Sequence, residues 1–513
     1  MRLLLTDDHS RLGAALARAL AADHEVRILD DPRDREAAAA AVADREAVVC
    51  LVPTPLDDGP EGQVALDRAT RGTYNLLTTR DPAAPLPRLV LVSSLAHFDR
   101  YPADSLVDEA WAPWPTTSLR TLVPYLAELT AREVTRVRRT ETIVLRLGAI
   151  VGGVGTAPPP PSSLCVHIDD AVRAVGLALA LPPPKDDAPG ERWRLFHIDD
   201  GGADSRYPPT RATTTVLGYV STHRLTDARA TPLLAATLTE WRPSPPLVPI
   251  PPRPIRRVLM LGAGGPLGAV AAAALARDFH LRLADIRPLG EIAVGPPQSP
   301  GAPLPRPLGP PHEECLVDVT DQAQVVAAAE GMDAILNLTV MRRDPDEAFR
   351  VNLLGALNVM RAADRHSIRR VVQTGPVQMI LDHPAGYGAD FGLPEDAPSR
   401  PGDDLYFLSK FLGQELVRVF AEERGGEVPC LLFGNFVDPA LAPPADYRLW
   451  SFTLSWADAG AALARAIATP SFPRPFQVLH PNADLPHGRY PNAEAKRLLG
   501  WRPKDRLEAF WRR

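Results

Sequence analysis

A tyrosine and a lysine four residues apart, Tyr406 and Lys410, form the pair in this chain best suited to acid–base chemistry. The 513-residue chain contains only four lysines and takes its other basic residues from arginine, so this spacing is seldom met by chance. On a helix, residues i and i+4 share a face, and a nearby ammonium lowers the pKa of a phenol from about 10. The pair therefore predicts a tyrosine that transfers a proton. A surface helix with a solvated lysine has the same spacing, so evidence from elsewhere in the chain has to decide.

The second informative feature lies upstream, where an apolar segment runs into Gly262, Gly265 and Gly268 and then into an alanine-rich segment. Glycines at this spacing between a strand and a helix let the backbone approach a pyrophosphate, which binds at the helix N-terminus. The next apolar segment, 280–285, ends in Asp285, whose carboxylate would accept hydrogen bonds from the adenosine ribose and repel a 2′-phosphate. The order strand, glycines, helix, strand and acid predicts a dinucleotide site that favours NAD over NADP.

With these features in order, residues 255–513 resemble an extended short-chain dehydrogenase/reductase of the NAD-dependent epimerase/dehydratase family. The segments around Asp318, Asn337, Asn352 and Thr374 follow in the order that this family shows. The resemblance implies a doubly wound parallel α/β sheet, NAD as cofactor, no bound metal, and a catalytic triad of Thr374, Tyr406 and Lys410. The cofactor contacts that it implies come from Gly262, Gly265, Gly268, Asp285, Asp318, Val319, Leu338, Asn352 and Lys410.

Within the family, the segments 285–289, 448–455 and 500–505 are most similar to the uronate dehydrogenase branch. The chain departs from that branch after Thr374, where Gly-Pro replaces Asn-His. It also departs at Phe433, where the branch has an arginine that would bind a carboxylate. The resemblance therefore leaves the substrate open.

The predicted function is NAD-dependent hydride transfer from a hydroxyl carbon of a sugar or sugar-acid-like substrate. Asn435 and Arg448 are candidate substrate contacts, although ordinary loop roles account for both equally well. A sugar-nucleotide epimerase starts with the same hydride removal and stays an alternative. A dehydratase is disfavoured, because Gly375 and Pro376 supply no acid pair. A non-enzymatic NAD-sensing or scaffold protein is the third alternative, although it has no need of an intact triad.

Residues 1–242 repeat the plan of the second half with eroded chemistry, which predicts a tandem duplication. The matched positions are Asp7, Ser10 and Gly13 for the three glycines, Asp30 for Asp285, Gly72 and Asn75 for Gly355 and Asn358, Ser94 for Thr374, Tyr125 for Tyr406, and Leu129 for Lys410. An aspartate in the phosphate turn would repel a pyrophosphate, and the missing lysine leaves Tyr125 without a reason to ionise. We therefore predict a non-catalytic pseudoenzyme domain; ligand binding without turnover is the alternative.

The proline-rich segment 243–254 reads as a semi-extended linker between the halves. A second proline-rich stretch, Gly295–Pro311, reads as a loop inserted after the second strand of the later copy. Because the family commonly pairs through the helices carrying its Tyr-x-x-x-Lys segment, we expect the halves to form an internal pseudo-dimer. The helix residues expected to meet there are Leu122, Leu126, Leu129, Phe407, Phe411 and Leu412.

Composition excludes several other classes of protein. The net charge of −6 comes without a basic stripe, which argues against nucleic-acid binding. The four scattered cysteines and twelve histidines show neither a disulfide framework nor metal-ligand spacing. The early acids Asp7 and Asp8 argue against a signal peptide, and no apolar run reaches the length of a membrane span. The expected location is the cytoplasm.

Overall fold

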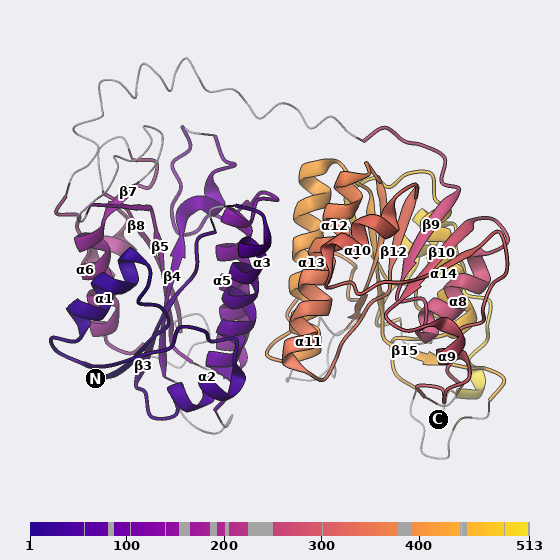
Figure 1. Ribbon diagram of the computed structural model, residues 1–513, viewed down its shortest axis with the longest axis horizontal. Coiled ribbons are helices and arrows are strands. Elements are labelled where there is room, and N and C mark those ends of the chain that lie inside the picture. The colour runs from indigo at the N-terminus through magenta and orange to yellow at the C-terminus, as the bar shows by residue number, and fades with distance from the viewer. Residues whose placement is uncertain are drawn as a thin grey trace. The chain divides into compact units, whose positions relative to one another are not determined.

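The computed structural model describes residues 1–55, 57–80, 87–102, 104–138, 140–152, 165–184, 192–200, 205–223, 250–299, 301–377, 392–441, 443, 449–486 and 488–510. The chain forms two compact units, Met1–Pro246 and Leu247–Arg513, each a layered α/β body (Figure 1). The division falls inside the expected linker 243–254, of which 243–249 lie outside the described residues. Residues 250–254 contain no helix or strand.

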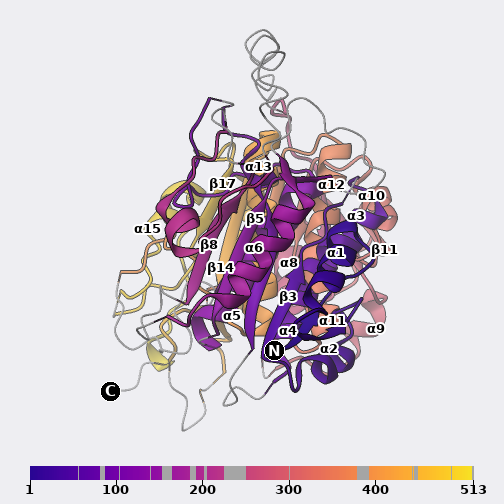
Figure 2. The same ribbon diagram turned by 90° about the vertical axis from the view of Figure 1, so that its left-hand side faces the viewer.

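The first unit is built on a six-stranded parallel sheet with the order β2-β1-β3-β4-β5-β8. Its strands are β1 Arg2–Leu5, β2 Glu25–Ile28, β3 Ala47–Leu51, β4 Arg88–Ser94, β5 Thr142–Leu147 and β8 Trp193–Ile198, with a separate parallel pair, β6 Ala149–Val151 and β7 Cys165–His167. Helices α1 and α6 pack together on one face, which Figure 2 shows from the front, and α2 to α5 cover the other. The helices are α1 Arg11–Leu20, α2 Arg35–Val42, α3 Pro60–Asp67, α4 Thr73–Thr78, α5 Leu119–Arg138 and α6 Ile168–Ala180.

The second unit contains a seven-stranded parallel sheet with the order β11-β10-β9-β12-β13-β14-β17. Its strands are β9 Arg257–Leu261, β10 His280–Asp285, β11 Glu313–Leu316, β12 Ala334–Asn337, β13 Arg370–Pro376, β14 Val428–Phe433 and β17 Phe476–Leu479, with a separate parallel pair, β15 Asn435–Val437 and β16 Thr453–Ser455. Helices α8 and α14 pack on one face, and α10, α12 and α13 on the other (Figure 1). The helices are α8 Pro266–Leu275, α9 Leu289–Ala293, α10 Gln322–Ala329, α11 Pro345–Phe349, α12 Gly355–Arg365, α13 Leu405–Arg424, α14 Trp456–Ala468 and α15 Ala493–Leu499.

Short helical turns complete both units. A π-helical turn precedes α4 in the first unit and α12 in the second, at Arg68–Gly72 and Arg350–Leu354. Turns of 3-10 helix occur at Leu95–Phe98 and Glu508–Phe510, and a further π-helical turn at Ala212–Val216.

The predicted doubly wound parallel sheets are confirmed. Strands such as β12 and β14 are buried along their whole length, because helices cover both faces of a parallel sheet. In each sheet the strand order reverses beside the first strand, between β1 and β3 and between β9 and β12. Ligands of such sheets bind in the crevice at the carboxyl ends of the strands at this reversal. The carboxyl ends of β9 and β12 therefore mark where a site should lie.

The second unit differs from the first by one edge strand. In the first unit the chain passes from β2 directly to α2, whereas in the second β10 is followed by α9, the Gly295–Pro311 segment and β11 before α10. Described residues of that segment form no helix or strand, as expected for an inserted loop. The loop packs closely against a distant segment of the chain, because a Cβ on Gly301 would lie 2.8 Å from the Leu441 side chain.

Among the described residues the four cysteines form no disulfide, and three of them are buried. Among the described residues, the helices are too short or too polar to cross a membrane.

Candidate active site

The loop after β9 has the geometry that a dinucleotide phosphate requires. Gly262 has φ +82°, a left-handed conformation that favours glycine, and a Cβ there would lie 2.9 Å from the backbone of Leu338. Gly268 packs against the loop so tightly that a Cβ would come within 2.5 Å of the Ala263 carbonyl oxygen. A Cβ on Gly265, the N-cap of α8, would meet only one atom, 3.6 Å away, so the space in front of this helix end is open. The three glycines thus close the turn, expose the helix N-terminus and let the helix approach the sheet.

Asp285 ends β10 beside this loop. Its carboxylate accepts a hydrogen bond from the Gly264 amide at 2.8 Å and one from the Arg287 amide at 3.4 Å. These bonds fix the carboxylate at the edge of the phosphate loop, where an adenosine ribose would lie. Further along the same edge, Asp318 accepts hydrogen bonds from Thr320, and Val319 is buried, its carbonyl accepting from Asn358.

The carboxyl end of β12 joins two members of the predicted triad through hydrogen bonds. Asn337 accepts at its backbone carbonyl from the hydroxyl of Thr374 at 3.2 Å, and at its side chain from the hydroxyl of Thr339 at 2.7 Å. The ammonium of Lys410 donates to the Thr339 carbonyl at 3.0 Å. Strand β13, helix α13 and the end of β12 are therefore held together where the crevice is expected. Leu338, which lies between Asn337 and Thr339 in the chain, is buried.

Tyr406 and Lys410 lie in the first turns of α13, whose N-cap Asp404 accepts a hydrogen bond from the Phe407 amide at 3.0 Å. Lys410 is only 4% exposed, and burial, helped by the charge of Arg342, lowers its pKa to about 8. Burial raises the pKa of Tyr406, while the charge of Arg342 and a hydrogen bond from its side chain lower it. The net pKa of Tyr406 lies above its usual value, and Arg342 rather than Lys410 is the cation that opposes the rise.

Arg342 was not anticipated from the sequence. It follows β12, and its guanidinium carbon lies 5.1 Å from the centre of the Tyr406 ring. The backbone of the preceding residue, Met341, is held twice by Asn352: its amide donates to Oδ1 at 3.1 Å, and its carbonyl accepts from Nδ2 at 2.7 Å. Asn352 Nδ2 also donates to the Ser409 hydroxyl at 2.9 Å. Asn352 therefore positions the loop; its predicted cofactor contact stays a prediction.

Of the two candidate substrate residues, the structure describes Asn435 and leaves Arg448 outside its described residues. Asn435 begins β15, directly beyond β14, and its side chain donates to the Thr453 hydroxyl at 3.4 Å. It lies at the carboxyl edge of the sheet, in the region expected for substrate.

In the first unit, the matching phosphate loop is occupied by its own side chains. Asp7 accepts hydrogen bonds from the amides of His9, at 2.8 Å, and Ser10, at 3.3 Å, and Ser10 accepts from the amide of Gly13 at 3.0 Å. Burial opposes the ionisation of Asp7, but these bonds and the charge of Arg68 hold its pKa below the usual value. The loop therefore places a negative charge on the donors that would bind a phosphate.

The region after β4 in the first unit is filled by a buried polar cluster. Glu128 on α5 pairs with Arg146 on β5 at 2.7 Å and accepts a hydrogen bond from the Ser93 hydroxyl at 2.6 Å. Phe98 lies against Arg146, and His97 is completely buried beside Glu128. Sequence spacing did not anticipate this cluster, because its members come from β4, the following turn, α5 and β5.

The expected match of Tyr125 with Tyr406 is wrong when helix ends are compared. Both α5 and α13 have 20 residues, and three residues separate each from the following strand. Counted from these ends, Arg120 stands at the position of Tyr406 and Pro124 at that of Lys410. A match of Tyr125 with Tyr406 shifts α5 by five residues relative to α13. Neither register supplies a lysine, so the prediction of an incomplete triad is unaffected.

The crevice of the second unit fits NAD. The open helix end at Gly265 would take the pyrophosphate and Asp285 the adenosine ribose. Among the described residues, Lys410 makes a single hydrogen bond, to Thr339. Since an ammonium has three donors, two remain for ribose hydroxyls.

The second unit is similar to known proteins. The NAD dependent epimerase/dehydratase family matches residues 258–448. Uronate dehydrogenase of Pseudomonas syringae pv. tomato is 30% identical over 261 residues, which are 50% of this chain and 85% of that protein. NAD-dependent glucose-6-phosphate dehydrogenase of Haloferax volcanii is 24% identical over 265 residues, 49% of this chain and 95% of that protein. The crystal structure of uronate dehydrogenase from Agrobacterium tumefaciens is 29% identical, with a TM-score of 0.41, and covers 50% of this chain and 86% of that one.

Proposed function

This chain belongs to the NAD-dependent epimerase/dehydratase family, and from that premise we propose that its second unit oxidises a hydroxyl carbon of a sugar-acid-like substrate. The chain is an NAD-dependent oxidoreductase close to the uronate dehydrogenases. The proposal adds the class of substrate and the division of labour between the two units.

The observation that carries the proposal is the buried ammonium of Lys410 one helical turn after Tyr406. A lysine that is 4% exposed is costly to keep unless its charge is used, and its one described partner is the Thr339 carbonyl. Its remaining donors suit the hydroxyls of a nicotinamide ribose. Tyr406, on the same face of α13, then stands beside the reacting carbon.

NAD supplies the acceptor for a hydride when it is bound. The side chains do the rest. Tyr406 takes the proton of the substrate hydroxyl while the C–H bond of the same carbon breaks and a carbonyl forms. The hydride carries away both electrons of that bond, and the proton stays on Tyr406. The Thr374 hydroxyl, which donates to the Asn337 carbonyl at the end of β12, orients the substrate oxygen. Lys410 holds the cofactor ribose, and the charge of Arg342 favours the phenolate.

The experiment is a screen of purified protein and NAD against hexuronic acids, hexose phosphates, neutral sugars and sugar nucleotides. Absorbance of the reduced cofactor follows turnover, and chromatography follows the sugars. We expect reduced cofactor to accumulate with at least one acidic sugar. Accumulation of an epimer without reduced cofactor would favour the epimerase alternative, and inactivity with every sugar would contradict the proposal.

For the first unit we propose a degenerate copy of the second, because equivalent elements share the same contacts. Arg88 begins β4 and pairs with Glu141, before β5, at 2.8 Å. Arg370 begins β13 and pairs with Glu427, before β14, at 2.6 Å. Each arginine also donates to two carbonyls in the last turn of α6 or α14. An unrelated domain would have no reason to repeat this arrangement.

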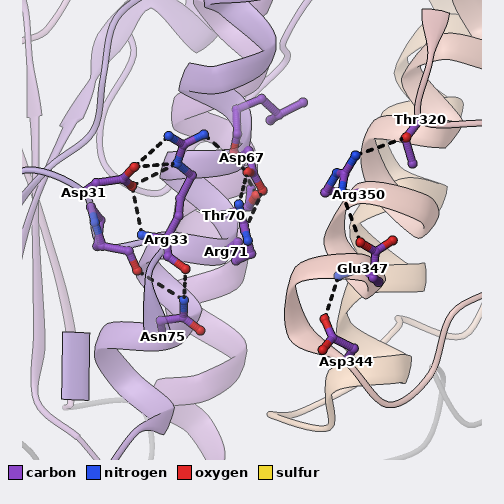
Figure 3. Close-up of polar contacts among 12 residues, drawn as sticks. Asp31, Arg33, Asp67, Thr70, Arg71, Asn75, Thr320, Asp344, Glu347 and Arg350 are labelled. Atoms are coloured by element: carbon purple, nitrogen blue, oxygen red, sulfur yellow. Dashed lines mark hydrogen bonds and ion pairs between the residues drawn. The ribbon is translucent and has the colours of Figure 1, made fainter. Parts of the chain in front are cut away.

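A second shared contact lies on the opposite face of each sheet. Asn75 donates to the carbonyls of Pro32, at 3.1 Å, and Arg33, at 2.9 Å, in the loop after β2 (Figure 3). Asn358 donates to the Val319 carbonyl at 3.0 Å, in the loop after β11. These contacts align the two loops and support common descent with loss of one edge strand.

The same alignment brings Asp31 to the position of Asp318. Figure 3 shows Asp31 bound by Arg33, with Nη2 to Oδ2 at 2.6 Å, so the carboxylate is neutralised within its own loop. In the second unit the nearby Arg350 donates to Glu347, at 3.1 Å, and to Thr320, at 3.4 Å (Figure 3). It does not pair with Asp318, which stays available for an adenine contact.

We propose that the first unit is not catalytic because its own side chains occupy the places where a cofactor and a substrate would bind. Asp7 occupies the amides that a phosphate would need, and the Glu128–Arg146 pair fills the region after β4. Ser94 caps the turn that follows β4 by accepting from the Ala96 amide. These contacts argue against both turnover and the alternative of ligand binding at this place.

Pairing of the two units through α5 and α13 stays a prediction. Residues 255–513 expressed alone should then self-associate, because the helical face that the first unit covers would be exposed. Sedimentation of the fragment against the full chain measures this. A monomeric fragment with full activity would refute the pairing.

A further inference from the structure

We propose that Arg342 forms an anion-binding subsite beside Tyr406 and holds a carboxylate or phosphate carried by the sugar substrate. This inference rests on the proposed function and names its substrate class more closely. No sequence motif assigned this residue a role.

Arg342 lies where the reacting part of a substrate is expected. The Arg342 guanidinium carbon lies 5.1 Å from the centre of the Tyr406 ring, at the carboxyl end of β12. A tyrosine that accepts a proton has to touch the reacting hydroxyl. A group bound by Arg342 therefore lies within a few ångströms of that hydroxyl, on the substrate itself. The pyrophosphate of NAD is expected at the N-terminus of α8, at the other end of the cofactor site.

The backbone beside the arginine is held while its side chain stays accessible. Asn352 binds both the amide and the carbonyl of Met341, and it also binds Ser409, on the helix that carries Tyr406. Arg342 itself is exposed, and no carboxylate among the described residues forms an ion pair with it. The backbone is fixed, and although one guanidinium N–H donates to Tyr406, the exposed group keeps further donors for an oxyanion.

Phe433, at the end of β14, is buried and apolar, so its side chain offers no charge to an anionic substrate. Arg342, in the loop after β12, supplies a guanidinium on the other side of β13 in the sheet. An anionic sugar would then bind with its charged group turned toward β12 and Tyr406. Neutral sugars would leave the arginine without a partner.

Two kinds of substrate share this chemistry, a hexuronic acid and a hexose phosphate. Calorimetry distinguishes them, with each sugar titrated into protein saturated with reduced cofactor, which prevents turnover. Neutral hexose serves as the third arm. The wild type should bind one acidic sugar more tightly than the neutral hexose, and the tighter of the two acidic sugars identifies the anion.

Arg342→Met should weaken binding of that sugar on the order of 10- to 100-fold, the usual value of a charged hydrogen-bonded contact. Arg342→Lys should recover part of the loss, and binding of neutral hexose and of cofactor should not change. Arg343→Met is the matched control, because Arg343 is the adjacent exposed arginine and has no assigned role. It should bind as the wild type does.

A second readout separates substrate binding from a merely structural effect. Where turnover is measured, Arg342→Met should raise the KM for the acidic sugar far more than that for NAD. Its rate profile should also move to higher pH, because the phenol loses the cation that lowers its pKa. Unchanged affinity for the acidic sugar in Arg342→Met, or equal losses for acidic and neutral sugars, would overturn the inference. Tight, Arg342-dependent binding without NAD reduction would uphold the subsite and contradict the proposed oxidation.

Discussion

Replacing Lys410 by methionine should stabilise the second unit while it abolishes turnover. In the folded protein burial lowers the pKa of this lysine from 10.5 to about 8. Below about pH 8 the lysine is protonated in both the folded and the unfolded chain, so its desolvation is fully felt. The difference in pKa corresponds to about 3 kcal/mol of lost stability near neutral pH.

The net gain is smaller, because the variant also loses the hydrogen bond from Lys410 to Thr339, at 3.0 Å. Such a bond contributes about 1 kcal/mol. The variant should therefore gain about 2 kcal/mol near pH 7, or about 4–8 °C in the melting temperature of a unit of this size. As the pH rises toward 10.5 the wild-type lysine loses its proton and the penalty fades. At about pH 9.5 it falls to roughly 1 kcal/mol, and the two proteins should unfold almost together.

Scanning calorimetry of the full chain measures both values. The transition of the second unit is the one that NAD moves to higher temperature in the wild type. Lys504→Met is the control, since Lys504 is an exposed lysine of the same unit; it should show no such pH dependence. A Lys410→Met protein that melts below the wild type at pH 7, or whose gain does not change with pH, would refute the reasoning.

Two further predictions concern catalysis and folding. Tyr406→Phe should lower turnover by orders of magnitude because it removes the proton acceptor, whereas Tyr125→Phe should leave it unchanged; initial rates of NAD reduction decide, and a fully active Tyr406→Phe would rule out the assigned role. Glu427→Gln should destabilise the second unit by about 3–5 kcal/mol, since it leaves the guanidinium of Arg370 buried without its counter-charge. Glu141→Gln should cost the first unit less, because the Arg88–Glu141 pair is partly exposed. Denaturant unfolding checks both, and a loss below about 1 kcal/mol in Glu427→Gln would contradict the structural role of its pair.

The parts of the site that the sequence predicted are those encoded by short-range spacing. The three glycines, Asp285 and the Tyr406–Lys410 pair lie within single strand–turn–helix or helical segments, where order along the chain determines order in space. Asp7 was correctly expected to disfavour a phosphate, although the structure adds that it takes the loop amides for itself.

The parts that the sequence did not predict depend on contacts between distant segments. Arg342 follows a strand as an ordinary loop arginine, and only the packing of α13 against the end of β12 brings it to Tyr406. The Glu128–Arg146 pair similarly joins a helix to a strand. The register of α5 follows from the length of the helix and of its following turn, so a match of Tyr125 with Tyr406 by residue type gives the wrong alignment.

Titration calorimetry of NAD into the full-length protein tests most directly the claim that one unit works and the other is silent. The account predicts one site per chain. It also predicts that Gly268→Ala removes that site, because the new Cβ would lie 2.5 Å from the Ala263 carbonyl oxygen, whereas Gly290→Ala, with nothing within 4 Å, keeps it. Two equal sites in the wild type, or a site that survives in Gly268→Ala, would contradict the claim.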